Sequence, residues 1–492
     1  MPTVVLVLKV LLILFLGFIG LTLIRAYFFV PKKLESEKLP DENVDAERAA
    51  KNLTRAIQIK TISYPNDEDV DWDEFYKFHD FLDEAYPLAK ENLTREKIDK
   101  ASLLYRWKGE DSSLDAVALL SHIDVVPVSE GTEGDWTHPA FEGHNDGEFI
   151  WGRGALDMKN HLVCVMEAIE ALLAEGFKPK RDIYLCFGHN EEVVGSDQAG
   201  AKSIMETLKD RGVRLDCVLD EGGAILPVNI KGVINKKLAG IGIAEKGYAD
   251  FEVSVIEKGG HSSQPPNHTG LGKLAKVIQD LENNQFKAQM PEFVMDLFNR
   301  IGRNVSYPAR IVTCNLWLLR PLIKAIMKRI PPAASLIRTT TAVTMAQGSP
   351  AANVLPQNAN ITANFRHMPG STLEDVERHI RKVSKNKKIE VKLLKGKDPS
   401  KFSPTDSRAF KTIEKLCVQA DPDNIVAPFL VMGGTDAYFY EPICDNIYRF
   451  APFTVNTQLL LCTHATDERI LVKVLEDGVT FFKRFTRTMA SE

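Results

Sequence analysis

Between Ser102 and Asp220 the chain alternates short apolar runs of strand type with longer amphipathic runs of helix type. The strand-type runs are "SLLYRWKG", "AVALLSHI", "RDIYLCFG" and "LDCVLD", and "KNHLVCVMEAIEALLAEG" lies between the second and the third. The apolar residues of this last run share one helix face: Leu162, Val165, Met166, Ile169 and Leu173. Strands that alternate with helices of this length predict an α/β fold, in which helices cover both faces of a mostly parallel sheet.

The pattern changes at "EKGYADFEVSVIEKGGHSS", where Phe251, Val253 and Val255 alternate with polar residues. Such alternation is typical of a half-exposed strand in an antiparallel sheet. We therefore predict a small α+β unit over residues 247–398, inserted into an α/β unit made of residues 45–246 and 399–492.

The N-terminus carries the apolar run "TVVLVLKVLLILFLGFIGLTLI", whose one charge is Lys9. About 20 apolar residues suffice to cross a bilayer. No convincing small-residue cleavage site follows, which favours a signal anchor over a cleaved signal peptide. We predict a transmembrane segment or signal anchor over residues 1–30 and a polar linker over residues 31–44.

The orientation of this segment is open on sequence grounds. Arg25, Lys32 and Lys33 follow the span, and the positive-inside rule would place the body in the cytosol. Against this, N-x-S/T sequons of the kind glycosylated in secreted proteins begin at Asn52, Asn92, Asn267, Asn304 and Asn360. We favour a membrane-anchored or secreted glycoprotein of the secretory pathway with a lumenal or extracellular body.

Charge and cysteine content exclude two other classes of protein. A net charge of -5 over 492 residues offers no polybasic surface, so we expect no nucleic-acid partner. The seven cysteines show no C-x-x-C spacing, which argues against a cysteine zinc site and a dense disulfide framework.

Histidine and carboxylates follow three of the predicted strands. "ALLSHID" ends in His122 and Asp124, "YLCFGHNEE" runs into Glu191 and Glu192, and "DCVLDEGG" ends in an Asp-Glu pair at 220–221. "GRGALDMKN" places Asp157 in a glycine-rich turn before a helix. Because ligands of open α/β sheets bind beyond the carboxyl ends of the strands, these groups should converge on one rim.

Carboxylates gathered in this way repel one another unless cations are bound. Oxygen and imidazole donors without thiolates fit Zn²⁺ or another divalent first-row metal. In "SHID" the two ionisable residues lie on one strand face, so Asp124 can orient His122 through the second ring N–H.

The chain resembles the zinc metallopeptidase family that includes aminoacylase, carboxypeptidase S and N-fatty-acyl-amino acid synthase/hydrolase, and within it the last of these most closely. The matching segments run from about residue 45 to the C-terminus: "SHIDVVP", "WGRGALDMKN", "GHNEE", "LDEGG", "GGHSSQPP", "NVLPQNANITANFRHMPG", "GGTDA" and "THATDERI". The resemblance implies a dizinc exopeptidase-like catalytic domain (residues 45–246 and 399–492) and a lid or dimerisation domain (residues 247–398).

The resemblance also implies two Zn²⁺ per subunit. Asp157 would bridge them, with His122 and Asp220 completing one ion and Glu192 and His464 the other. Glu221 is the alternative to Asp220 in this role. Glu191 resembles the general base, and Asp124 the acid that supports the first histidine.

From the inserted unit, His261 resembles a lid histidine that reaches the reacting carbonyl, in some relatives from a partner subunit through a homodimer. Arg366, Asn353 and the loop Gly433, Gly434, Thr435 and Asp436 match groups that hold a substrate carboxylate. The alternatives are a turn histidine for His261 and a strand-end surface charge for Arg366.

The implied activity is hydrolysis, and in reverse synthesis, of N-fatty-acyl amino acids by metal-hydroxide attack on the amide. The alternative is a carboxypeptidase S-like zinc exopeptidase that releases a C-terminal amino acid from peptides. A non-catalytic protein that kept the fold would lack metal ligands or the base, whereas every expected position is filled here.

A further segment, "LWLLRPLIKAIMKRIPPAASLI", Leu316 to Ile337, mixes bulky apolar residues with basic ones. It predicts either a helix that packs on the core, which we favour, or a segment at a membrane surface suited to a fatty acyl substrate.

Overall fold

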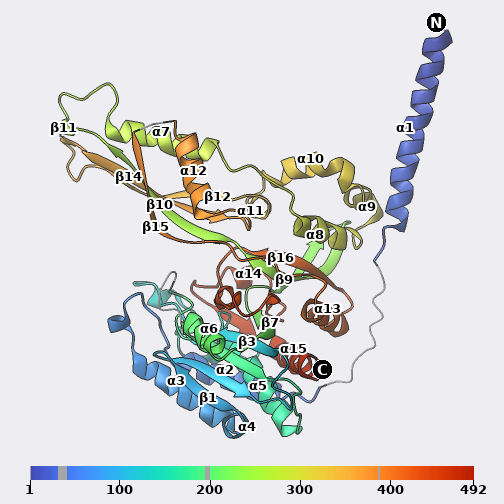
Figure 1. Ribbon diagram of the computed structural model, residues 1–492, viewed down its shortest axis with the longest axis vertical. Helices are drawn as coiled ribbons and strands as arrows, with labels where there is room; N and C mark the ends of the chain where they lie inside the picture. The colour runs from blue at the N-terminus through green and yellow to red at the C-terminus, as the bar shows by residue number, and fades with distance from the viewer. Residues whose placement is uncertain (1, 32–41, 194–199, 386–387, 492) are drawn as a thin grey trace.

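Figure 1 shows the computed structural model, which describes residues 2–31, 42–193, 200–385 and 388–491. Most of the predicted linker, residues 32–41, lies outside this range. The strands form a nine-stranded main sheet, a four-stranded small sheet and two minor sheets of three and two strands.

The main sheet has the strand order β1-β2-β6-β3-β7-β17-β9-β16, with β8 paired to β9. Its strands are β1 (Thr94–Ile98), β2 (Ser102–Trp107), β3 (Ala116–His122), β6 (Ile183–Gly188), β7 (Leu215–Asp220), β8 (Ile225–Ile230), β9 (Ile234–Glu245), β16 (Asn424–Val431) and β17 (Ile447–Arg449). The central strands β6, β3, β7 and β17 are parallel, and β1, β2 and β8 pair antiparallel. The predicted α/β fold with a mostly parallel sheet is confirmed.

Strand β3 explains why the sequence shows a continuous apolar run there. All seven of its residues are buried, because helices cover both faces of the sheet. One face packs against α5 (Lys159–Ala174). Three further helices contact α5 on this side: α2 (Ala46–Gln58), α4 (Pro87–Asn92) and α15 (Lys473–Ala490). Helix α6 (Gly200–Asp210) and the short helix η3 (Asp436–Tyr440) cover the other face.

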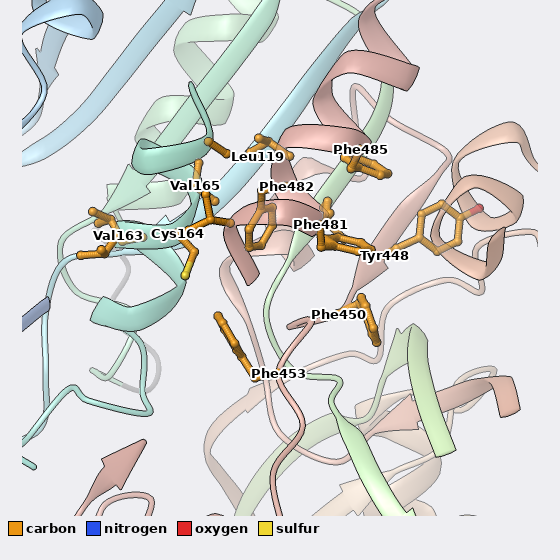
Figure 2. Close-up of a cluster of buried hydrophobic side chains, with 14 of the residues drawn as sticks. Leu119, Val163, Cys164, Val165, Tyr448, Phe450, Phe453, Phe481, Phe482 and Phe485 are labelled. Carbon is orange, nitrogen blue, oxygen red and sulfur yellow. The ribbon is translucent and has the colours of Figure 1, made fainter. Parts of the chain in front are cut away.

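The largest apolar cluster lies between α5, α15 and the sheet. Figure 2 shows Phe481, Phe482 and Phe485 of α15 gathered with Cys164 of α5 and Leu119 of β3. Each fully buried side chain of this size contributes about 1.5–3 kcal/mol to folding. Helix α15, near the end of the chain, is thereby joined to α5 and β3, although the chain leaves this unit between them.

The small sheet is antiparallel, with the order β12-β14-β10-β15. Its strands are β10 (Gly247–Ile256), β12 (Thr340–Gln347), β14 (Asn358–His367) and β15 (Ile389–Lys397). Helices α7 (Gly270–Asn283) and α12 (Leu373–Val383) cover one face, and Phe251, Val253 and Val255 point into that core as predicted. The chain passes from the main sheet to the small sheet between β9 and β10.

Remaining elements connect or flank these sheets. The helices are α1 (Pro2–Phe28), α3 (Trp72–Ala85), α8 (Glu292–Gly302), α9 (Tyr307–Thr313), α10 (Leu316–Met327), α11 (Pro331–Ser335), α13 (Arg408–Ala420), α14 (Thr457–Leu460), η1 (Asp67–Asp69) and η2 (Glu133–Asp135). The strands are β4 (His144–Asn145), β5 (Phe149–Trp151), β11 (Gly260–His261), β13 (Val354–Leu355) and β18 (Arg469–Leu471). Within the described residues, α1 alone is long and apolar enough to cross a membrane.

Candidate metal centre

Two loops and the ends of β3, β6 and β7 bring the candidate residues to one edge of the main sheet. His122 is the last residue of β3 and is buried. Its ring Nδ1 lies 2.9 Å from the backbone oxygen of Asp124 and 3.4 Å from the Asp124 carboxylate. The proton on Nδ1 is thereby engaged, which leaves Nε2 free to face the cluster.

Asp124 does more than orient His122. Its buried carboxylate accepts hydrogen bonds from the hydroxyl of Ser63 at 2.6 Å and from the backbone N–H groups of Glu191 and Glu192, each at 3.1 Å. One aspartate at the end of β3 therefore sets the turn that carries both glutamates after β6.

Asp157 lies between two histidines that are distant in the sequence. One carboxylate oxygen is 3.2 Å from Nε2 of His122, and the other is 3.1 Å from Nε2 of His464. Each oxygen thus faces a different imidazole, which is the arrangement a bridging carboxylate needs.

Glu468 holds the turn before Asp157 through backbone hydrogen bonds. This buried carboxylate accepts from the backbone N–H groups of Gly154, Leu156 and Asp157, and it pairs with buried Arg153 at 2.5 Å. Since Glu468 follows His464 by four residues, one loop places a histidine and also fixes the carboxylate opposite it.

His464 completes the cluster from the C-terminal part of the chain. Its Nε2 is 3.0 Å from a carboxylate oxygen of Glu192, and its side chain is half exposed. Its backbone has φ 59, in the left-handed region that a non-glycine residue rarely adopts.

Asp220 and Glu221 differ sharply in their surroundings. Glu221 has a carboxylate oxygen 3.5 Å from Nε2 of His122, whereas buried Asp220 accepts from the backbone N–H of Ala437 at 2.8 Å. The geometry therefore favours Glu221, the alternative considered from the sequence, over Asp220 as the carboxylate of the cluster.

Electrostatics show that the cluster is unfavourable without cations. Burial raises the pKa of Glu191 and of Glu192, and burial together with nearby Asp157 raises the pKa of Glu221 to about 8. Hydrogen bonds to Asp157 and Glu192 raise the pKa of His464 to about 10. Divalent cations would relieve this repulsion.

The donor atoms also lie close enough together to share ions. Oxygen and nitrogen atoms within 4.8 Å of one another occur in two groups around His122, one with Glu191 and Glu221 and one with Asp157 and Glu192. Carboxylate oxygens and imidazoles without sulfur are a donor set that suits Zn²⁺. The residues present therefore fit a pair of divalent metals.

Comparison with known proteins identifies the family. The model of peptidase family M20/M25/M40 matches residues 118–488. The chain belongs to this M20 family. It is 36% identical over 479 residues to a probable carboxypeptidase S-like 2 of Dictyostelium discoideum, covering 95% of this chain and 91% of that one. It is 32% identical over 475 residues to N-fatty-acyl-amino acid synthase/hydrolase PM20D1 of Xenopus tropicalis, covering 94% and 91% respectively.

Solved structures agree with the M20 fold. The metallo-carboxypeptidase Sso-CP2 of Sulfolobus solfataricus superimposes with a TM-score of 0.62 at 18% identity, over 89% of this chain and 98% of that one. M20 enzymes are metal-dependent hydrolases of amide bonds, generally with two zinc ions. The family predicted from the sequence is confirmed, and this M20 chain is a metallohydrolase of amides.

Two of the predicted residues of the small-sheet unit, His261 and Asn353, lie on or beside β11, far from β3 and β7 in Figure 1. His261 is on β11, exposed at the end of the small sheet that is remote from the main sheet. Exposed Asn353 lies beside it, since its carbonyl accepts from the N–H of Ser262 at 3.0 Å. A single chain thus does not bring these two residues to the metal centre.

Arg366 occupies a half-buried position on β14. Its guanidinium stacks 4.6 Å from the centre of the Tyr248 ring, and burial lowers its pKa. Within the described part of the chain it makes no ion pair. The guanidinium therefore stays available to an external carboxylate.

The loop of Gly433, Gly434, Thr435 and Asp436 is held by a residue that sequence reasoning missed. Buried Glu245, at the end of β9, accepts from the N–H of Thr435 at 3.1 Å and from its hydroxyl at 2.7 Å. Glu245 also pairs with buried Arg449 at 2.6 Å. The signal available in the sequence was the charged "EK" in the apolar run "IGIAEKGYADF".

Proposed function

We propose that this M20 chain is a two-metal amidohydrolase that cleaves N-fatty-acyl amino acids into a fatty acid and a free amino acid, and joins them when both are abundant. The observation that carries the proposal is Asp157, with one oxygen toward His122 and the other toward His464. Two ions could share this carboxylate beside the half-buried Glu191.

The residues that would hold the ions form two sets with Asp157 in common. His122 and Glu221 belong to one set, and Glu192 and His464 to the other. Bound divalent ions lower the pKa of a coordinated water and polarise the amide carbonyl.

Glu191 supplies proton transfer. Its carboxylate takes the proton of the attacking water as the water oxygen bonds to the carbonyl carbon, and it returns that proton to the amide nitrogen as the C–N bond breaks. Asp124 fixes its position through the Glu191 backbone N–H. Burial raises its pKa, which favours the protonated state needed for the second transfer.

Arg366 recognises the free carboxylate that both N-acyl amino acids and peptides carry. A guanidinium can form paired hydrogen bonds to a carboxylate, and Arg366 is half buried on a surface shared with Tyr248. Asn353 and the loop of residues 433–436 would complete this recognition when the small-sheet unit approaches the metal centre. The exposed His261 would act on the reacting carbonyl, from the same chain after closure or from a second copy in a homodimer.

The apolar helix α1 supports the assignment of a substrate with a fatty acyl group. This helix would hold the enzyme at a membrane, where such substrates partition. We propose that α1 is a signal anchor and that the body is lumenal or extracellular. Of the five sequons, the one at Asn52 is unsuited to glycosylation in this fold, since Asn52 is buried and donates to Glu167 at 2.7 Å.

The second candidate is release of a C-terminal amino acid from peptides, favoured by the 36% identity to a probable carboxypeptidase S-like protein. Turnover of N-acyl glycines of rising chain length, measured beside Gly-X dipeptides, separates the two. Turnover that rises with chain length supports the lipid amide, and faster cleavage of the dipeptides would assign the chain to the second activity.

A further inference from the structure

The helices between the two sheet units expose an unusual apolar surface. Helix α10 buries Leu316 and Met327 against the body but leaves large apolar side chains in solvent on its other face. The exposed fractions there reach 54% for Trp317, 57% for Leu322 and 48% for Ile326. Leu318, Leu322 and Ile326 recur every four positions and therefore form a stripe along one side of the helix. We call this stripe, with Trp317 and Ile330 at its two ends, the α10 face.

Helix α9 packs against the C-terminal end of α1, and α10 follows α9 along the chain (Figure 1). The ring of Trp317 meets Phe18 edge to face, with centroids 6.0 Å apart, and Arg25 lies 5.9 Å over the same indole. The hydroxyl of Tyr307 on α9 donates to the carbonyl of Leu23 at 3.1 Å. The exposed face is therefore continuous with the helix proposed to enter the membrane.

The lengths agree with a helix at the bilayer surface. The 27 residues of α1 extend about 40 Å at 1.5 Å per residue, and the hydrocarbon core of a bilayer is about 30 Å thick. The remaining part, about seven residues, is the end that contacts α9 and α10. Interfacial amphipathic helices bury their apolar face about 5–10 Å below the bilayer surface. Trp317 contacts Phe18, which lies about 6 Å along α1 from the seven residues left outside the hydrocarbon core.

Charge around the α10 face also suits phospholipid headgroups. No aspartate or glutamate occurs between Asp296 and Glu374, whereas basic residues recur through this stretch. Between residues 303 and 329 they are Arg303, Arg310, Arg320, Lys324, Lys328 and Arg329. Lysine and arginine beside an apolar stripe are typical of helices that lie in a membrane interface.

We infer that the α10 face docks into the phospholipid bilayer in which α1 is anchored, so that the enzyme is held at two points and oriented on the lipid surface. The inference rests on the proposed membrane role of α1. It assigns a membrane-binding function to the segment that sequence analysis favoured as a core-packing helix.

Trp317 provides a direct test, since it is the one tryptophan of five that lies on this face. The full-length chain is reconstituted in phosphatidylcholine vesicles with a minor share of phosphatidylglycerol, with and without brominated acyl chains. Bromolipids should quench a component of the emission that Trp317→Phe removes. Unquenched Trp317 in vesicle-bound protein would overturn the inference, and a chain that leaves the vesicles would overturn both the anchor and the inference.

A variant pair tests the function of the α10 face. Leu322→Ser with Ile326→Ser should lower turnover of a long-chain N-acyl amino acid in vesicles by about tenfold, with turnover of a soluble short-chain analogue unchanged. Leu394→Ser, at a 47% exposed residue of the small sheet, is the control and should leave both rates unchanged.

Equal long-chain rates in the wild type and the double variant would contradict docking. Absence of turnover on every N-acyl substrate, with quenching intact, would instead reject the proposed function alone. A detergent-stable dimer lost in the double variant would assign the face to a second copy and overturn the inference.

Discussion

Nε2 of His464 lies 3.1 Å from a carboxylate oxygen of Asp157, although the two residues come from the two separate chain segments of the α/β unit. This contact closes the cluster at the edge of the main sheet, because Asp157 also faces His122. The C-terminal loop is therefore as much a part of the centre as the strand ends before it.

Replacing Glu191 with glutamine should lower the turnover number by about 10²–10⁴-fold, because the amide cannot accept the proton of the attacking water. Metal content should stay at the wild-type level, as measured by elemental analysis of the purified variant. Glu148→Gln, at an exposed residue, serves as the control. Near-normal turnover of the Glu191 variant would reject its role as the base.

Replacing Glu221 with glutamine should remove or weaken one metal ion, because the side chain would no longer offer a carboxylate beside His122. Asp220→Asn should instead leave the metal content unchanged and lower the melting temperature, because Asp220 is buried and holds the N–H of Ala437. Elemental analysis and thermal unfolding of both variants decide between the two acids. The opposite pattern would restore Asp220 as the ligand.

Metal affinity of the apo-protein should rise with pH. His464 has a pKa of about 10 when only Asp157 and Glu192 face it, so it is protonated near neutrality, and a metal must displace that proton. Each proton displaced makes the apparent association constant rise up to about tenfold per pH unit below the pKa. Calorimetric titration with zinc in buffers of different ionisation enthalpy counts the protons. His464→Asn should release one fewer, and an unchanged count would mean that His464 is not a ligand.

Arg366→Ala should raise KM for N-acyl amino acids by about 10–100-fold, since a hydrogen bond to a charged group contributes about 1.5–3 kcal/mol. The same change should affect substrates with a methyl-ester-blocked carboxylate far less. Lys392→Ala, at an exposed residue of β15, is the matched control. An equal loss on blocked and free substrates would contradict a carboxylate-binding role.

Glu245→Gln should destabilise the protein by about 3–5 kcal/mol, because it leaves the buried charge of Arg449 without its partner. The hydrogen bonds to Thr435 would weaken as well, so the loop of residues 433–436 should lose its position. Chemical denaturation gives the stability, and Glu282→Gln at an exposed surface residue is the comparison. A stability equal to the wild type would show that this ion pair is dispensable.

The sequence by itself determined the parallel sheet, the inserted antiparallel unit and most of the cluster. Strands buried on both faces need continuous apolar runs, and polar residues directly after such a run can only lie at the sheet edge. That reasoning brought His122, Glu191 and Glu192 to one rim. The resemblance to a family then added His464, which no local pattern connects to them.

Only the tertiary structure decided which of two adjacent acids belongs to the cluster and which side of a helix is exposed. Asp220 and Glu221 are adjacent, and successive strand residues point to opposite sides, so the packing of β7 and η3 selects which acid faces His122. Glu245 acquires its role because β9 ends beside a loop almost two hundred residues later. The apolar face of α10 has the periodicity of a core helix. It is exposed because the rest of the protein packs against the opposite side of α10, which carries Leu316 and Met327. Local periodicity records that a side is apolar, whereas the packing of distant segments decides what covers it.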